Sequence, residues 1–184
     1  MLSAFSTSFA PAQTTVATIV EPPITTSERF HWLLSENLSP VSLLENMAIG
    51  GEETLTGYSK EYGTHWAGYG KRVGMVTANY GVNTVMEAGL GSIWGEDPRY
   101  ERMQGESIRK RLGNVVRMTF LARNREGNLK PAYARFIAIP ASSFLENTWM
   151  PDSEATVGDA GIRAGLGFLS RMGENVWKEF RPRR

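Results

Sequence analysis

The stretch GTHWAGYGKRVGMVTANYGVNTVMEAGLGSIWGEDPRY, residues 63–100, decides the fold of this chain. Small residues recur along it at steps of three, four or seven, and bulky apolar residues repeat with the same helical period. The small series is Gly63, Ala67, Gly70, Gly74, Ala78, Gly81 and Ala88, and the bulky series is Trp66, Tyr69, Val73, Val76 and Tyr80. We therefore expect one long helix over about 63–95, ended by Gly95 and the nearby Pro98.

A second glycine series lies in residues 156–180. Gly158, Gly161 and Gly165 recur at helical spacing, and apolar residues from Ile162 to Phe180 continue one side of the same helix. A glycine inside a helix costs about 1 kcal/mol relative to alanine, so a series of them indicates close contact with another backbone. We predict that the helices at 63–95 and 156–180 are close neighbours.

The remaining segments predict shorter helices. Expected are a helix capped by Thr26 or Ser27, one from Pro40 to Gly50-Gly51, one with the apolar face of Ile108, Leu112, Val115, Val116, Thr119 and Phe120, and a kinked helix or two short ones over 132–149 around Pro140. No segment sustains strand-like alternation, and Asn124–Asn128 reads as a turn. The sequence predicts an all-α bundle of about five to six helices, with residues 27–184 as a single helical domain.

Residues 1–26 have a different character. Ala10-Pro11-Ala12 fits the small-x-small pattern of a signal-peptidase site, but the preceding residues lack the basic start and the strong apolar core of a secretory signal. We interpret 1–26 as a disordered tail or a remnant signal peptide. The sequence holds no run of about 18 uncharged apolar residues, which argues against a conventional membrane-spanning helix.

Charge is unevenly distributed along the chain. The formal net charge is +1, yet residues 1–62 carry seven acidic and two basic groups, and residues 99–135 carry ten basic and three acidic groups. This basic region includes Arg109, Lys110 and Arg117. It is interpreted as a solvated helix face, as a contact for anionic lipid or protein, or as a nucleic-acid contact.

Few residues are suited to catalysis. The chain has no cysteine and only two histidines, His31 and His65, so thiolate chemistry and cysteine-bound zinc are excluded. Asp97 and Arg99 form either a charge pair at a site, with Glu96 as a base, or a structural turn in which Asp97 caps backbone amides. The carboxylates Asp152, Glu154 and Asp159 favour capping of the last helix over metal binding. We predict no catalytic residue, no metal site and no cofactor.

Several short motifs occur together in this chain. They are Gly68-Tyr69-Gly70-Lys71-Arg72, Glu96-Asp97-Pro98-Arg99-Tyr100, Asn147-Thr148-Trp149, Pro151-Asp152, Ala155-Thr156-Val157-Gly158-Asp159 and Asn175-Val176-Trp177-Lys178-Glu179-Phe180. With these pieces, over about residues 25–182, the chain resembles a family of small, predicted exported proteins associated with acidobacterial genomes. The resemblance implies export and brings no activity with it. Family members end in Trp-Pro-Asp where this chain has Arg181-Pro182-Arg183.

Two functions of different classes follow from these features. The first is a non-enzymatic structural or interaction protein of the cell envelope, periplasmic or membrane-associated, that binds a membrane surface or other protein chains, in homo- or hetero-oligomers. The interaction candidates are Gly70, Gly74, Ala78, Gly81, Gly158, Gly161, Gly165, Arg109, Lys110, Arg117, Trp149 and Trp177, and the tryptophans expected on the surface also include Trp32, Trp66 and Trp94. The alternative is a helical bundle that binds a small molecule or a lipid between the two glycine-rich helices.

Overall fold

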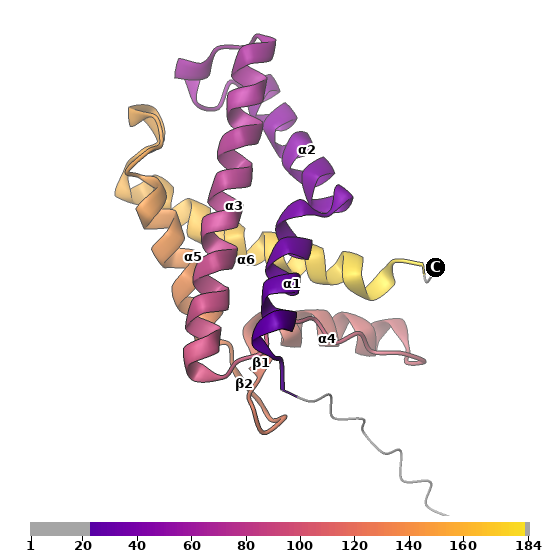
Figure 1. Ribbon diagram of the computed structural model, residues 1–184. Coiled ribbons are helices and arrows are strands. Elements are labelled where there is room, and N and C mark those ends of the chain that lie inside the picture. The colour runs from indigo at the N-terminus through magenta and orange to yellow at the C-terminus, as the bar shows by residue number, and fades with distance from the viewer. Residues whose placement is uncertain (1–22, 183–184) are drawn as a thin grey trace, which may run out of the picture.

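The computed structural model describes residues 23–182 and shows an all-α fold, which confirms the predicted fold class (Figure 1). The predicted tail or signal remnant lies outside the described residues, apart from 23–26. The α-helices are α1 (Thr26–Leu38), α2 (Pro40–Thr56), α3 (Trp66–Trp94), α4 (Ile108–Phe120), α5 (Tyr133–Glu146) and α6 (Val157–Phe180). The 3-10 turns η1 (Lys60–Tyr62) and η2 (Asp152–Glu154) precede α3 and α6, and a hairpin of β1 (Leu121–Arg123) and β2 (Leu129–Pro131) joins α4 to α5.

The long helix α3 is the central element of the fold. Helices α5, α2 and α1 pack directly against it, while α6 packs on α5 and α4. In Figure 1, α6 crosses behind α3 and α4 lies along the lower edge of the molecule. Helix α5 therefore packs against both α3 and α6.

The prediction that the two glycine-rich helices pack against each other is wrong. α3 and α6 meet through long side chains instead: Glu87 pairs with Arg171, and the Tyr80 hydroxyl donates to Glu174 at 2.8 Å. These polar groups hold the two backbones apart. The close approach that the glycines permit is made elsewhere, where Gly167 lies under the Ile139 side chain of α5.

Helix starts follow from their capping residues. Thr25 and Glu28 form a reciprocal capping box at α1, so the cap lies just before the predicted Thr26 or Ser27. Ser39 caps α2, whose first residue is Pro40 as predicted. Thr156 and Asp159 form a second capping box at α6. The prediction that Asp159 is a capping carboxylate is confirmed.

Helix α2 does not end at Gly50-Gly51, contrary to the prediction. It continues to Thr56 and ends at Gly57, whose positive φ of 70° suits glycine. Gly50 is instead a packing position, because a Cβ built on it would lie 2.7 Å from Cγ2 of Val73 on α3. The glycine lets α2 pack closely on α3.

The segment between α4 and α5 also differs from the prediction. The turn at Asn124–Asn128 is confirmed, with Asn124 Oδ1 accepting from the backbone amides of Glu126 and Asn128. It closes a hairpin that the sequence did not predict, because strands of three residues are too short to show alternation. Beyond it, Pro140 lies inside α5, which is one helix and not two.

Charged side chains occupy much of the interior. Arg72 on α3 is buried and donates to the carbonyl oxygens of Tyr58, Ser59 and Gly63 at 2.6–3.0 Å, which fixes the segment before α3. The largest buried apolar side chains are few: Trp32, Val115, Met118 and Ile139. The prediction that Trp32 lies on the surface is wrong, because its side chain is buried. The interior thus combines a small apolar core with many ion pairs.

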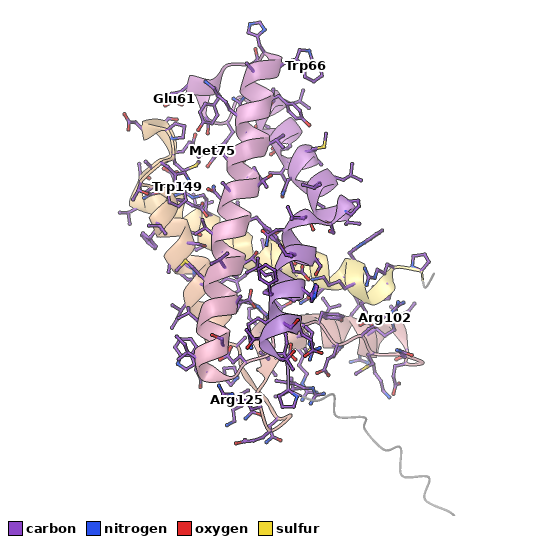
Figure 2. The ribbon with its side chains drawn as sticks, in the orientation of Figure 1. Glu61, Trp66, Met75, Arg102, Arg125 and Trp149 are labelled. Carbon is purple, nitrogen blue, oxygen red and sulfur yellow. The ribbon has the colours of Figure 1, made fainter. Side chains whose placement is uncertain are left out.

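Large apolar side chains are correspondingly exposed. On α4 only Val115 and Thr119 of the predicted buried face are inside, whereas Ile108, Leu112, Val116 and Phe120 are exposed. On α5, which was expected to bury its apolar residues, Ile137, Phe144 and Leu145 face outward. Figure 2 shows Trp66 at the start of α3 and Trp149 beyond α5, both on the outside.

Two glycine substitutions test this packing. We expect Gly50→Ala to lower the free energy of unfolding by about 1–3 kcal/mol, because its methyl group would collide with Val73. Gly74→Ala on α3 is the matched control: nothing lies within 4 Å of its Cβ position, and alanine favours a helix by up to about 1 kcal/mol. Urea unfolding measures both, and equal effects of the two changes would contradict the α2–α3 contact.

Candidate functional site

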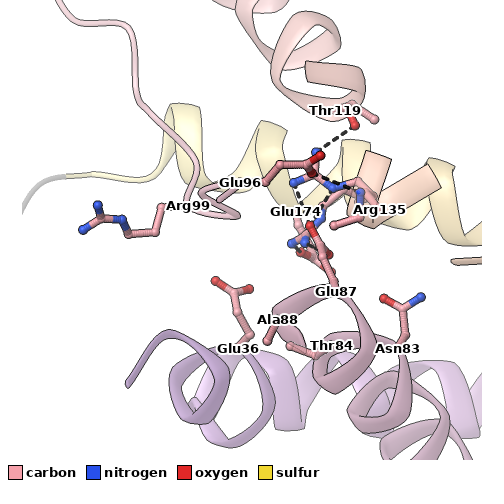
Figure 3. Close-up of polar contacts among 12 residues, drawn as sticks. Glu36, Asn83, Thr84, Glu87, Ala88, Glu96, Arg99, Thr119, Arg135 and Glu174 are labelled. Carbon is pink, nitrogen blue, oxygen red and sulfur yellow. Dashed lines mark hydrogen bonds and ion pairs between the residues drawn. The ribbon is translucent and has the colours of Figure 1, made fainter. Parts of the chain in front are cut away.

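A buried ionic centre connects three helices of the fold. Glu87 of α3 accepts from Arg135 of α5, with 2.9 Å between Oε1 and Nε, and its other oxygen pairs with Arg171 of α6 (Figure 3). The side chains of Glu87, Arg135 and Arg171 are all nearly inaccessible to solvent. We call these three residues the ionic centre.

The ionic centre also reaches α4. Arg135 Nη1 donates to the carbonyl oxygens of Met118 and Thr119 at 2.8 Å, and so satisfies free carbonyls at the end of α4. The Thr119 hydroxyl accepts from Asn175 Nδ2 of α6 at 3.1 Å. Four helices are therefore held together by polar contacts at one buried point.

Electrostatics keep the centre ionised. Burial by itself raises the pKa of Glu87, but the two guanidinium groups outweigh it and hold the pKa below its ordinary value. Burial likewise lowers the pKa of Arg171, yet Glu87 and Glu174 raise it above the usual value. The charges stabilise one another, since each has lost its hydration.

A chain of ion pairs leads from the centre toward α1. Arg171 Nη1 lies 3.2 Å from Oε2 of Glu174, and Lys178 lies between Glu174 and Glu36 of α1. The Lys178 ammonium is 2.7 Å from Glu36 Oε2. Burial is the main cause that raises the pKa of Tyr80, whose hydroxyl donates to Glu174. The network thus joins α1, α3, α5 and α6.

Beside the network lies a cavity of about 490 Å³ between α2, α3, α5 and α6. Most of the wall surface is apolar, although most of the residues that form it carry polar side chains; the apolar side chains include Ile49, Val76 and Ile139. The polar lining comprises Ser42, Glu45, Asn46, Asn79, Tyr80, Asn83, Thr84, Ser142, Ser143, Glu146, Arg163, Ser170, Arg171 and Glu174. This cavity lies between α3 and α6, the two helices for which the sequence predicted close contact, and is also lined by α2 and α5.

Glu146 is the titratable group of special interest in this cavity. Its Oε2 lies 3.2 Å from Nε of Arg163, but burial dominates and raises its pKa to about 7. Arg163 is held in place by the carbonyl oxygens of Glu154 and Ser143 at 2.7 and 3.1 Å. A carboxyl with such a pKa can take up and release a proton near neutral pH.

A second buried carboxylate fixes α4 to α6. Glu179 accepts from the Tyr100 hydroxyl at 2.6 Å, the Met103 amide at 3.1 Å and Arg111 Nε at 2.8 Å. Burial raises its pKa, but these donors, Arg111 first, lower it below the ordinary value. Glu179 is therefore a structural anchor for the loop before α4.

The residues around Asp97 have the structural role that the sequence offered as one alternative. Asp97 Oδ1 accepts from the Arg99 amide at 3.0 Å, and Arg99 pairs with Asp97 and approaches Glu28. Glu96 Oε2 accepts from the Ala134 amide at 3.0 Å, which caps the start of α5. A small pocket of about 180 Å³ adjoins this motif, and its wall includes Asp97, Glu101 and Arg123.

The predicted interaction residues occupy separate places. Gly70 and Gly74 on α3, and Gly161 and Gly165 on α6, have open space over their Cβ positions, whereas Gly81 lies near Asn37 and Gly158 near Thr156. Ala78 is exposed on α3, and Arg109, Lys110 and Arg117 are exposed on α4. Trp149 and Trp177 are each less than half exposed, and Trp149 donates to Asn79 Oδ1 at 2.9 Å. The structure does not bring these residues into one site.

The residues of the ionic centre were not predicted from the sequence. A signal for them exists: Glu87 is the only charge between Val73 and Trp94, and Arg135 and Glu146 are the only charges in α5. A lone charge in an otherwise uncharged helix indicates a buried partner, because an unpaired buried charge is costly.

Comparison with known proteins adds no family: no protein-family model, no curated protein and no solved structure matches this chain.

The ionic centre predicts a large effect for a small change. We expect Glu87→Gln to lower the free energy of unfolding by about 3–5 kcal/mol, because it leaves Arg135 buried without a counter-charge and Arg171 with Glu174 alone. The same substitution at Glu106, whose pair with Lys110 is exposed, should cost less than about 1 kcal/mol. Chemical denaturation of both variants makes the comparison, and a cost at Glu87 as small as that at Glu106 would contradict the role of the centre.

Glu146 predicts a pH dependence of stability. Its pKa is about 7 in the folded protein and 4.5 in a free side chain. Because the folded state holds the proton more tightly, the contribution of Glu146 makes the free energy of unfolding fall as pH rises from about 5 to 8. Glu146→Gln should make this fall shallower, since glutamine does not ionise.

Thermal denaturation across this pH range measures the slope. Some dependence should remain in Glu146→Gln, because burial also raises the pKa of Glu53 to about 7. An unchanged slope would show that Glu146 does not titrate between the folded and unfolded states as described.

Proposed function

We propose that this protein is a non-enzymatic structural or interaction protein of the cell envelope, whose helix faces are covered by other protein chains. The placement in the envelope rests on the resemblance to exported proteins. Within residues 23–182, no helix has the combination of length and apolar character that a membrane span requires. The proposed activity is contact between surfaces, and the partners are further chains of this protein or of another.

The observation that carries the proposal is the distribution of charge in α3, α5 and α6. On α3 from Val73 to Trp94 the single charge, Glu87, points inward. On α5, Arg135 and Glu146 are both buried. On α6, every charge between Ala160 and Trp177 belongs to the interior network: Arg163, Arg171 and Glu174. We call the outward sides of these helices the uncharged faces.

Exposed apolar side chains cover the uncharged faces. They are Val85 and Ile93 on α3, Ile137, Phe144 and Leu145 on α5, and Ile162, Leu166, Leu169, Val176 and Trp177 on α6. Large exposed apolar patches on a folded protein indicate contact sites. Inward charges and outward apolar groups are typical of a chain whose surface is covered in its working state.

Open glycines favour a protein partner over lipid. Gly74 and Gly89 on α3, and Gly161, Gly165 and Gly173 on α6, have nothing within 4 Å of the Cβ position. Nothing within the chain uses these positions to offset their cost in helix stability. A partner helix can use them, because glycine allows two backbones to come close. Lipid chains are flexible and do not need glycine to come close to a helix.

The ion pairs of the network support a structural role. Glu87, Arg135 and Arg171 satisfy one another, and Glu179 is saturated by its donors. In the described part of the chain, no group of three or more His, Cys, Asp or Glu side chains is arranged to hold a metal ion. These charges maintain the fold that presents the uncharged faces.

The cavity favours a second candidate, a bundle that binds a small molecule or a lipid. Its volume of about 490 Å³ is within the range of ligand sites, and Glu146 adds a group that titrates near neutral pH. A small molecule retained in a native mass spectrum of the gently purified protein would support this candidate.

The assembly state tests the first proposal. We expect the purified protein to be oligomeric in mild detergent, and Gly165→Leu to reduce the measured mass to that of a monomer, because the new side chain blocks close approach on α6. The fold should be retained, since space over Gly165 is open. Gly113→Leu on α4, where space is also open, is the matched control and should leave the oligomer intact.

Size-exclusion chromatography with light scattering gives the masses, and circular dichroism checks the fold. A wild-type protein that stays monomeric at high concentration would overturn the proposal, as would a Gly165→Leu variant that assembles like the wild type.

A further inference from the structure

Helix α4 presents an exposed apolar stripe. Ile108, Leu112, Val116 and Phe120 follow one another at intervals of four residues, with 68%, 46%, 48% and 37% of their surface exposed. Steps of four advance by roughly 40° around a helix, so the four side chains form one slowly turning row. Phe120, at the end of the row, also stacks on Phe136 of α5 and Phe168 of α6, so among the residues that the structure describes the row is free of neighbouring rings at Ile108, Leu112 and Val116.

Basic side chains flank this stripe. Arg109, Lys110 and Arg117 are exposed on α4, and the helix contains no carboxylate. The fourth cation, Arg111, points inward and binds Glu179. The outward half of α4 therefore carries three positive charges beside an apolar row, and one of them, Lys110, also pairs with the exposed Glu106 just before the helix.

The inner half of α4 fixes this orientation. Val115, Met118 and Thr119 are buried, and Arg111 ties the first turns to α6. The helix packs on α6 and on β1, and in Figure 1 it lies along the edge of the molecule. Its outer half is consequently presented on a rigid support and needs no rearrangement to meet a flat surface.

We propose that α4 docks on the surface of an anionic lipid bilayer. The basic groups meet the headgroup phosphates, and the apolar stripe enters the boundary between headgroups and acyl chains. This docking is independent of the uncharged faces on α3, α5 and α6, and it adds a second partner to the proposed function.

The apolar stripe distinguishes lipid from nucleic acid. Binding of a nucleic acid depends on positive charge and does not require a row of exposed aliphatic side chains along the basic strip. A membrane interface uses both, because the helix lies in the plane where polar and apolar media meet. The side-by-side arrangement on α4 fits a planar interface.

Vesicle co-sedimentation of the whole protein tests the proposal. Vesicles of phosphatidylcholine alone are compared with vesicles that also contain phosphatidylglycerol, whose surface is negative. We expect strong binding to the anionic vesicles only, weakened by salt. The variant Arg109→Gln/Lys110→Gln/Arg117→Gln should bind on the order of 100-fold more weakly, since each basic group contributes to attraction near the surface.

A second variant separates the classes of partner. Ile108→Ser/Leu112→Ser/Val116→Ser keeps the charges and removes the stripe, and we expect it to lose vesicle binding as well. A single-stranded RNA oligonucleotide is the comparison ligand. If this variant still binds vesicles like the wild type, or if RNA binding is strong and unaffected by loss of the stripe, the lipid proposal is overturned.

The readouts distinguish this proposal from the assembly proposal. Both α4 variants should have the circular dichroism and the oligomeric mass of the wild type, since their side chains are exposed and lie outside the uncharged faces. If the wild-type protein is oligomeric but does not bind anionic vesicles at low ionic strength, only the lipid docking is overturned. A monomeric wild type that binds them overturns only the assembly.

Discussion

The fold depends on the ionic centre of Glu87, Arg135 and Arg171. Burying three charges costs several kcal/mol for each ion in desolvation, and the mutual attraction offsets this cost only when the geometry is satisfied. An apolar core would tolerate small shifts of α3, α5 and α6, but paired charges tolerate very little. The centre therefore fixes how these helices are placed, while the small apolar core provides part of the stability.

The same arrangement determines what the surface presents. Over residues 73–94 of α3, in α5 and over residues 160–177 of α6 the charges lie inside, and the outward sides carry apolar side chains and glycines. Helix α4 differs, since it keeps three cations outside beside its apolar row. The cavity between α2, α3, α5 and α6 lies beside the same charges, since Arg171 and Glu174 are part of its wall. The apolar character of the outward helix faces and the ion pairs of the interior therefore follow from the same placement of charged residues.

Much of the fold could be predicted from the sequence, and the orientation of its helices could not. Gly95 and Thr156 mark helix ends by local chemistry, so the long helices were found close to their true bounds. Burial was inferred from apolar character, and this failed for α4 and α5 because their apolar residues face outward. The predicted close backbone contact between α3 and α6 was wrong, because the lone charge Glu87 indicates a buried partner but does not tell that this partner is a long side chain 84 positions away.

The separation of Glu87 from Arg171 also bears on how the chain folds. Closing so long a loop costs chain entropy before the contact yields any energy, and contacts between distant residues slow folding relative to a bundle of local hairpins. Helix α3 can pair with α5 once residue 135 has been synthesised, but Glu87 keeps one oxygen unpaired until α6 arrives. Helix α6 thus completes the ionic centre.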